Sequence, residues 1–364
     1  MKDSLKSWQI RLALLVTILG VFLSLTRLIF FTFSPFQPRQ MTSVLFEIHK
    51  GQSPSEIIKS LTTNGIIKNG RYFLWVGRLG RQWRKIKAGE YRLSASMAPW
   101  EIYSLLTSGI SAAHPLTVRE GENIYEIGEN LESKGLMSQE HFVSLCKDKE
   151  LISSLPYFKD AAPPTLEGYL FPDTYFFNRT LSEVDIIKQM VHHFFKIWNN
   201  SDDERAKTLG LSRHEIITLA SIIEKETGAS EERPLISSIF HNRLQKHMKL
   251  QSDPTTIYGM WDHYHGKIHK KDLSAKNEYN TYYVNALPIG PIGNPGEEAI
   301  RAALYPSSSP YLYFVSHNDG THQFSKTIQE HNQAVKKFQL NPQARVGKSW
   351  RDHLKKTSST QTTQ

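Results

Sequence analysis

Two carboxylates near the end of one predicted helix are the residues of this sequence best suited to acid–base chemistry. Glu224 and Glu226 stand in the run Ile222-Ile223-Glu224-Lys225-Glu226-Thr227. A carboxylic acid held against apolar neighbours has a raised pKa, which suits a general acid at neutral pH. The alternative is that both carboxylates only solvate the end of the helix, as Glu-Lys-Glu often does.

The helix that carries these carboxylates is predicted from its own start signal and apolar face. Ser212-Arg213-His214-Glu215 is a capping box that opens the helix. At about 100° per residue, Glu224 and Glu226 fall on opposite flanks of the apolar face. Only one of them can line a given cleft, and helix geometry does not choose which. The apolar face is formed by four residues at helical spacing: Ile216, Leu219, Ala220 and Ile223.

Later loops supply rings and amides that suit a sugar chain. One turn precedes Tyr258, and a rigid Pro/Gly-rich loop covers residues 287–296. Sugar rings stack on aromatic faces, and amide side chains bind hydroxyl and acetamido groups. For each tyrosine, core packing is the alternative. The rings and amides singled out are Tyr258, Tyr279, Tyr282, Asn280 and Asn294.

The N-terminus carries a predicted membrane anchor. Residues 12–33 form a largely apolar stretch whose only charge is Arg27, and roughly 20 such residues span a bilayer. Lys2, Lys6 and Arg11 precede the span, so residues 1–11 are expected in the cytoplasm and the rest outside it. The alternative is a cleaved signal peptide, but no small-x-small cleavage site follows.

Charge and cysteine content restrict the partners. The chain has 364 residues and a formal net charge of +9. Outside a membrane, a basic protein meets anionic lipid headgroups or wall polymers, so no nucleic-acid partner is expected. Cys146 is the single cysteine, which rules out an intramolecular disulfide and predicts a small buried hydrophobe.

An internal repeat occupies the region after the anchor. Residues 46–75 and 116–145 align at a shift of about 70 positions. Each copy predicts a strand, a turn at Gly, an amphipathic helix, a Gly C-cap and a second helix. This pattern resembles LysM-like modules, which predicts either glycan binding or a simple spacer. The paired positions are Gly51 with Gly121, Glu56 with Glu126, Ile57 with Ile127, Leu61 with Leu131, and Gly65 with Gly135.

The predicted fold class is α+β, with a single transmembrane helix, LysM-like α/β modules and a catalytic domain. We expect one LysM-like module at 43–112 and a second repeat with linker at 113–160. The α+β catalytic domain is expected at 161–340. Residues 341–364 are basic, then Ser/Thr/Gln-rich, and are predicted to be disordered.

Several motifs in order resemble the endolytic murein transglycosylases, the MltG or YceG-like family. The similarity covers essentially residues 165–337. The matching motifs are residues 167–175 (EGYLFPDTY), 221–227 (SIIEKET), 243–244, 248–255 (MKLQSDPT), 279–282 (YNTY), 287–292 (LPIGPI), 310–315 and 320–324.

The resemblance implies a bacterial inner-membrane lyase that cuts nascent peptidoglycan strands internally and ends their elongation. It assigns the catalytic role to Glu226. It implies glycan strands as substrate, no cofactor and no metal, and peptidoglycan synthases as neighbours at the membrane. With the rings and amides above, the predicted substrate-binding set gains Glu167, Gln251, Asp253, Thr255 and Thr281.

Three other functions compete with a single-carboxylate lyase. A muramidase would pair Glu226 with Glu167 or Asp253 and add water to its product. A membrane-anchored scaffold would bind glycan equally well without Glu226. A metal site at His263, His265 and His269 has no carboxylate or cysteine at ligand spacing to support it.

Overall fold

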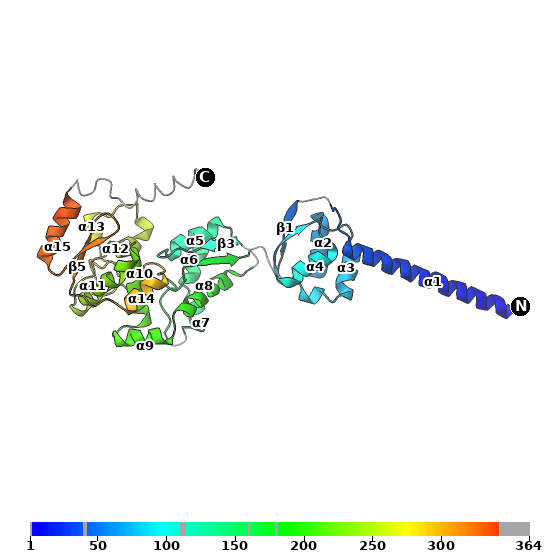
Figure 1. Cartoon of the computed structure of the whole chain (residues 1–364), viewed down its shortest axis with the longest axis horizontal. Helices are drawn as coiled ribbons and strands as arrows, with labels where there is room; N and C mark the ends of the chain where they lie inside the picture. The colour runs from blue at the N-terminus through cyan, green and yellow to red at the C-terminus, as the bar shows by residue number, and fades with distance from the viewer. Residues whose placement is uncertain (1, 39–41, 110–113, 159–160, 179–180, 342–364) are drawn as a thin grey trace. The chain divides into compact units, whose positions relative to one another are not determined.

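The computed structural model describes residues 2–38, 42–109, 114–158, 161–178 and 181–341, so the predicted tail lies outside it from residue 342 onward. The chain packs as two compact units, one of Met1–Pro115 with Phe176–Ser182 and one of Leu116–Tyr175 with Glu183–Gln364. Figure 1 traces the helices and strands along the chain. They confirm the predicted mixture of helices and strands, while the exact domain boundaries stay predictions.

The first unit begins with a long apolar helix, α1 (Lys2–Phe33). Its stretch Arg11–Phe33 is long and apolar enough to cross a membrane, and no residue of the 18-residue window that qualifies it is buried in the protein. A signal sequence has the same properties. The N-terminal apolar helix that the sequence predicts is therefore present.

The first copy of the repeat builds its own small core. β1 (Ser43–Ile48) pairs antiparallel with β2 (Gly89–Ser94). Helix α2 (Pro54–Thr63) starts at a capping box, and Pro54 fits its first turn because that position needs no N–H partner. The other elements are α3 (Gly70–Leu79), η1 (Trp83–Lys85) and α4 (Pro99–Ser108). Buried members of the core include Phe46, Ile57, Leu61, Phe73, Tyr91 and Leu106.

The second copy repeats this order and lies mainly in the second unit. β3 (His114–Thr117) is followed by α5 (Ile124–Ser133), α6 (Gln139–Cys146) and α7 (Lys149–Ser154). The predicted strand–helix–helix order is confirmed in both copies. Strand β4 (Thr174–Phe177) pairs with β3 and closes this copy, a partner that the sequence did not predict.

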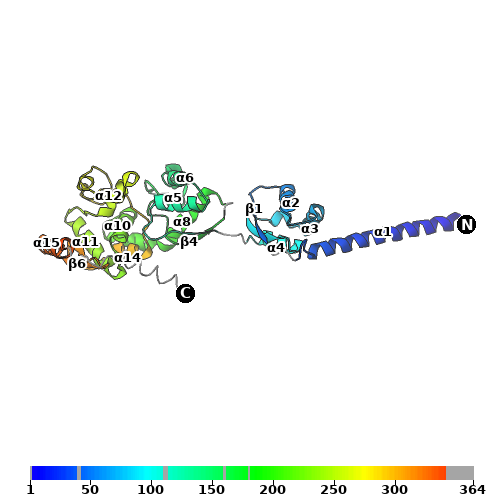
Figure 2. The ribbon, with the colours of Figure 1, turned by 90° about the horizontal axis from the view of Figure 1, so that it is seen from above.

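Helix α10 (Arg213–Glu226) lies at the centre of the second unit. Every residue from Ile216 to Ile223 is buried, so neighbouring helices cover it on several sides. In Figures 1 and 2, α11 (Arg233–Gln245) and α14 (Glu297–Leu304) lie close to it. The remaining elements are α8 (Glu183–Ile197), α9 (Asn200–Thr208), η2 (Ser230–Glu232), α12 (Asp253–Gly259), η3 (Trp261–His263), α13 (Lys270–Leu273), β5 (Tyr313–Ser316), β6 (His322–Ser325), α15 (Ile328–Val335) and η4 (Lys336–Leu340).

Candidate active site

Helix α10 delivers Glu226 to the site as its last residue. The helix starts where Ser212 Oγ accepts from Glu215 N at 3.2 Å and Glu215 Oε2 accepts from Ser212 N at 2.8 Å. This confirms the predicted capping box. At the other end Thr227 is extended, so the helix stops at Glu226. The buried middle of α10 fixes the helix, and its end presents the carboxyl group.

The two carboxylates of α10 have different partners. Glu224 accepts from Arg233 Nη2 at 3.0 Å and from Gly296 N at 2.9 Å, and its side chain is 6% exposed. Glu226 accepts a hydrogen bond from Ser252 Oγ. The expected separation onto two flanks is confirmed. Glu224 is committed to an ion pair and to the N-terminus of α14, and Glu226 faces the start of α12.

Glu226 is half-buried, and its environment suits proton exchange. Burial raises the pKa of Glu226 to about 7, because desolvation disfavours the carboxylate. The hydrogen bond from Ser252 and the positive charge of Arg243 oppose this shift, and the negative charge of Asp253 adds to it. At neutral pH both the acid and the base form of Glu226 are therefore populated.

Ser252 is held in place by a strained turn and two threonines. Gln251 adopts a left-handed φ of 52°, which is uncommon for a residue other than glycine. Ser252 N donates to Thr281 Oγ1 at 2.9 Å, and Thr255 Oγ1 donates to Ser252 O at 2.6 Å. Ser252 was missing from the predicted site, although it lies inside the 248–255 motif.

Arg243 is a second residue that the sequence prediction missed. It is 7% exposed and donates to Leu312 O at 2.7 Å and to Leu250 O at 2.8 Å. Its guanidinium group therefore braces the segment just before Ser252, and its charge acts on Glu226. The sequence did contain a signal for this residue, because residues 243–244 are one of the family-like motifs. That motif did not show what the arginine does.

Asp253 and Tyr282 complete the polar surroundings of Glu226. Tyr282 Oη donates to Asp253 Oδ1 at 2.6 Å, and Asp253 is exposed. The pKa of Tyr282 is raised by burial and then by its bond to Asp253, so the phenol stays protonated. The structure thus brings Asp253 and Tyr282, two of the predicted residues, to the acid.

Glu167 and Asn294 form a fully buried network. Glu167 Oε2 accepts from Tyr258 Oη at 2.7 Å and from Ile124 N at 3.0 Å. Asn294 Nδ2 donates to Glu167 Oε1 at 3.0 Å. Burial raises the pKa of Glu167 to about 7, and the hydrogen bonds from Ile124 and Tyr258 oppose the shift. These bonds favour a positioning role, and substrate contact by Glu167 and Asn294 stays a prediction.

Asn280 is also bonded within the protein. Its side chain is buried, with Nδ2 donating to Ala275 O at 2.8 Å and Leu273 O at 3.1 Å. Its Oδ1 accepts from Thr256 Oγ1 at 3.0 Å and from Tyr282 N at 3.0 Å. This pattern shapes the loop that carries Tyr282, so the proposed bond between Asn280 and substrate remains untested.

An aromatic hollow of about 530 Å³ lies in the same unit. We call it the tyrosine hollow. The rings of Tyr125 and Trp261 stack with centroids 5.6 Å apart, and those of Tyr258 and Tyr279 are 4.7 Å apart. Lys147 also lines it. Tyr258 and Tyr279, both predicted from sequence, thus line one concave surface, in which Tyr258 is buried and the half-buried ring of Tyr279 suits stacking on a sugar.

The structure defines a class of protein: a mixed α/β fold with a half-buried carboxyl group, Glu226, whose pKa near neutrality suits acid–base chemistry. A sequence profile described as the YceG-like family matches residues 46–337. The chain belongs to the YceG-like family.

Relatives of known name agree with this assignment. An endolytic murein transglycosylase of Bacillus subtilis is 34% identical over 320 residues, covering 84% of this chain and 87% of the relative. One from Streptococcus pneumoniae is 27% identical over 334 residues, covering 83% of this chain and 59% of the relative. The crystal structure of a putative yceG-like protein from Listeria monocytogenes is 32% identical with a TM-score of 0.56, covering 81% of this chain and all of that one.

Proposed function

We propose that this protein is an endolytic peptidoglycan lytic transglycosylase, a lyase that cuts glycan strands internally. The observation that carries the proposal is Glu226, a half-buried acid with a pKa of about 7 at the end of a rigid helix. Membership of a family whose relatives bear this activity in their names supports it.

Glu226 acts first as acid and then as base. As COOH it protonates the glycosidic oxygen between MurNAc and GlcNAc, and the 2-acetamido group stabilises the oxocarbenium-like centre. As carboxylate it takes the proton from the MurNAc C6 hydroxyl, which attacks C1 and closes a 1,6-anhydro ring. A pKa near neutrality suits both steps, and each contributes about 10²–10⁴-fold.

A muramidase needs a second carboxylate that water or substrate can reach. Glu167 is fully buried and accepts three hydrogen bonds from the protein, which does not favour that role. Asp253 is exposed and close enough for its charge to raise the pKa of Glu226, so it is the stronger candidate for the hydrolytic alternative.

The deciding experiment is mass spectrometry of the products made from purified glycan strands. A lyase leaves 1,6-anhydroMurNAc ends and consumes no water. Reducing MurNAc ends, heavier by one water, would establish the muramidase instead. A membrane-anchored scaffold would give no new ends at all.

The predicted substrate-binding residues divide by exposure. We propose that exposed or half-buried side chains touch the strand directly: Gln251, Asp253, Tyr279 and Tyr282. We propose that buried ones position these contacts: Glu167, Thr255, Tyr258, Asn280, Thr281 and Asn294. Alanine variants of the first group should raise KM, and those of the second should lower stability.

We further propose that α1 is a single-pass anchor in the inner membrane with the catalytic unit outside the cytoplasm. Lys2, Lys6 and Arg11 before the apolar stretch support this orientation. A reporter active only outside the cytoplasm, fused after Leu340, should be active. We also propose that the LysM-like copies bind glycan. Isothermal titration of the full chain with chitooligosaccharides would measure this binding, and the absence of any binding heat would favour a simple spacer.

A further inference from the structure

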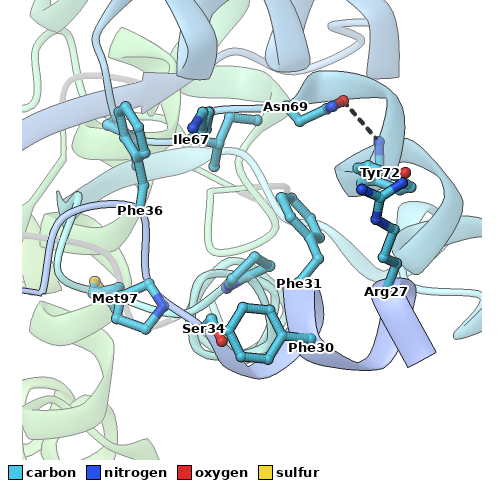
Figure 3. A pocket seen from close by; sticks show the side chains of 13 residues that line it. Arg27, Phe30, Phe31, Ser34, Phe36, Ile67, Asn69, Tyr72 and Met97 are labelled. Carbon is cyan, nitrogen blue, oxygen red and sulfur yellow. Dashed lines mark hydrogen bonds between the residues drawn. The ribbon is translucent and has the colours of Figure 1, made fainter. Parts of the chain in front are cut away.

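A cavity of about 620 Å³ lies between the end of α1 and the first repeat copy. We call it the anchor pocket. Figure 3 shows Arg27, Phe30 and Phe31 from α1 on one side, with Ile67, Asn69 and Tyr72 among the residues across from them. The rings of Phe31 and Tyr72 are 5.4 Å apart. The pocket is thus lined by the end of the apolar helix and the residues just after it, by the loop before α3 with Tyr72, and by Met97 and Pro99 at the start of α4.

The charges on the pocket wall have one sign. Arg27 and Lys68 line it, and no aspartate or glutamate does. Within the described parts of the chain, neither cation makes an ion pair with a carboxylate. Two cations that face one cavity without a counter-ion attract an anionic group, and a guanidinium group binds phosphate oxygens in pairs.

The position along α1 selects the kind of anion. Arg27 precedes Phe33, the last residue of the apolar stretch, by six residues, or about 9 Å of helix. Arginine in a span is costly unless its head group reaches the polar layer of the bilayer. The same region exposes aromatic rings: Phe30 is 73% exposed, Phe33 64% and Trp100 46%. Exposed tryptophan and cations near the end of a span mark the membrane–water interface.

We propose that the anchor pocket binds one anionic glycerophospholipid of the membrane leaflet that faces the catalytic unit. The lipid phosphate lies between Arg27 and Lys68, and its acyl chains follow the apolar surface of α1 beside Phe30 and Phe31. The inference rests on the proposed anchor. It gives the first repeat copy a lipid contact that orients it at the bilayer surface.

The test uses the full chain purified in detergent with equal amounts of phosphatidylglycerol and phosphatidylcholine. Native mass spectrometry then measures which lipid is retained. The unaltered chain should retain one phosphatidylglycerol in preference to phosphatidylcholine. Replacing both cations, Arg27→Gln with Lys68→Gln, should reduce that preference roughly tenfold, since each cation near an anionic surface contributes measurably to binding.

The matched control removes two exposed cations of the same copy that do not line the pocket, Lys59→Gln with Arg78→Gln. This control should keep the preference. Equal loss in both double variants would overturn the proposal in favour of diffuse attraction, and so would equal retention of the two lipids by the unaltered chain. Membrane fractionation separates the two proposals: recovery of the unaltered chain outside the membrane defeats the anchor, whereas a membrane-bound chain without lipid preference defeats only the pocket.

Discussion

The first repeat copy packs around a core of its own, whereas the second packs in the unit that contains Glu226. Locally the two are alike. Gly51 and Gly121 have φ values of 84° and 79°, and each precedes a capping box that opens a helix. The difference between the copies therefore lies in what surrounds the same local structure.

The glycine turn shows this difference most directly. A side chain at Gly51 would meet nothing within 4 Å, whereas one at Gly121 would meet Glu224 and Lys225 of α10. Gly121 N donates to Asn294 O at 2.7 Å, and a Cβ at Gly293 would lie 2.5 Å from Gly121 O. Only a residue without a Cβ atom at position 293 permits this close approach to the Gly121 carbonyl group. The turn of the second copy supports the Pro/Gly-rich loop against helix α10.

The two copies also differ at the first residue of the helix that follows the glycine turn. Pro54 opens α2 and has no N–H to donate. Its counterpart Ile124 opens α5, and its N–H donates to the buried carboxyl group of Glu167. The first copy therefore makes no hydrogen bond from the first position of its helix. The second copy uses the N–H at that position to hold Glu167.

The largest effect is expected from replacing Glu226, the proposed acid in the second unit. Glu226→Gln keeps the shape of the side chain but cannot donate and recover a proton, so strand cleavage should fall by about 10²–10⁴-fold. Glu224→Gln is the matched control, because it changes the same helix end and removes the negative charge that pairs with Arg233 instead. It should reduce stability while cleavage persists. A near-normal rate for Glu226→Gln, measured from the release of new strand ends, contradicts the single-acid mechanism.

The next effect concerns the N–H of Ile124, a donor that its counterpart Pro54 in the first copy lacks. Ile124→Pro removes the donor to Glu167, whereas Ile124→Ala removes the side chain and keeps the donor. Denaturant unfolding should show Ile124→Pro to be less stable than Ile124→Ala by about 1–3 kcal/mol, because a buried acceptor loses a partner. Pro54→Ala in the first copy should change stability by under about 1 kcal/mol. Equal stability losses in Ile124→Pro and Pro54→Ala would contradict this difference between the two copies.

A smaller effect is expected at the helix caps. Asn123 is 1% exposed and accepts from Tyr125 N and Glu126 N, both at 3.0 Å. Ser53 is exposed and accepts from Glu56 N at 3.4 Å. Asn123→Ala should cost about 1–2 kcal/mol and Ser53→Ala about 0.5 kcal/mol, measured by the same unfolding experiment. A larger loss at Ser53 would reverse the comparison.

The smallest effect is a displacement of the pH profile. The proposed mechanism requires protonated Glu226, so kcat/KM should decline as pH rises above about 7. The hydrogen bond from Ser252 lowers the pKa of Glu226, so Ser252→Ala should raise that pKa and move the decline to higher pH. Ser252→Thr keeps a hydroxyl group and should restore the original profile. An unmoved decline in Ser252→Ala would show that this hydrogen bond does not tune the acid.

Much of the local structure followed from short-range patterns. The apolar periodicity and the Ser212–Glu215 capping box predicted α10, and the Gly and cap positions predicted both repeat copies. These features depend on neighbours within about four residues, so the sequence alone contains the necessary information. The opposite flanks of Glu224 and Glu226 followed from the same geometry.

The partners of each carboxylate depended on residues distant in the sequence. Ser252 lies 26 positions from Glu226, and β4 closes the second copy from beyond its predicted end. Asn280, whose amide suggested substrate binding, bonds instead to its own loop. Sequence alone determined that Glu224 and Glu226 lie on different flanks of one helix, and the family resemblance pointed to Glu226. Only the tertiary structure decided that Glu224 is neutralised by Arg233 while Glu226 is desolvated beside Ser252 and Arg243, because burial and charge act through space and not along the chain.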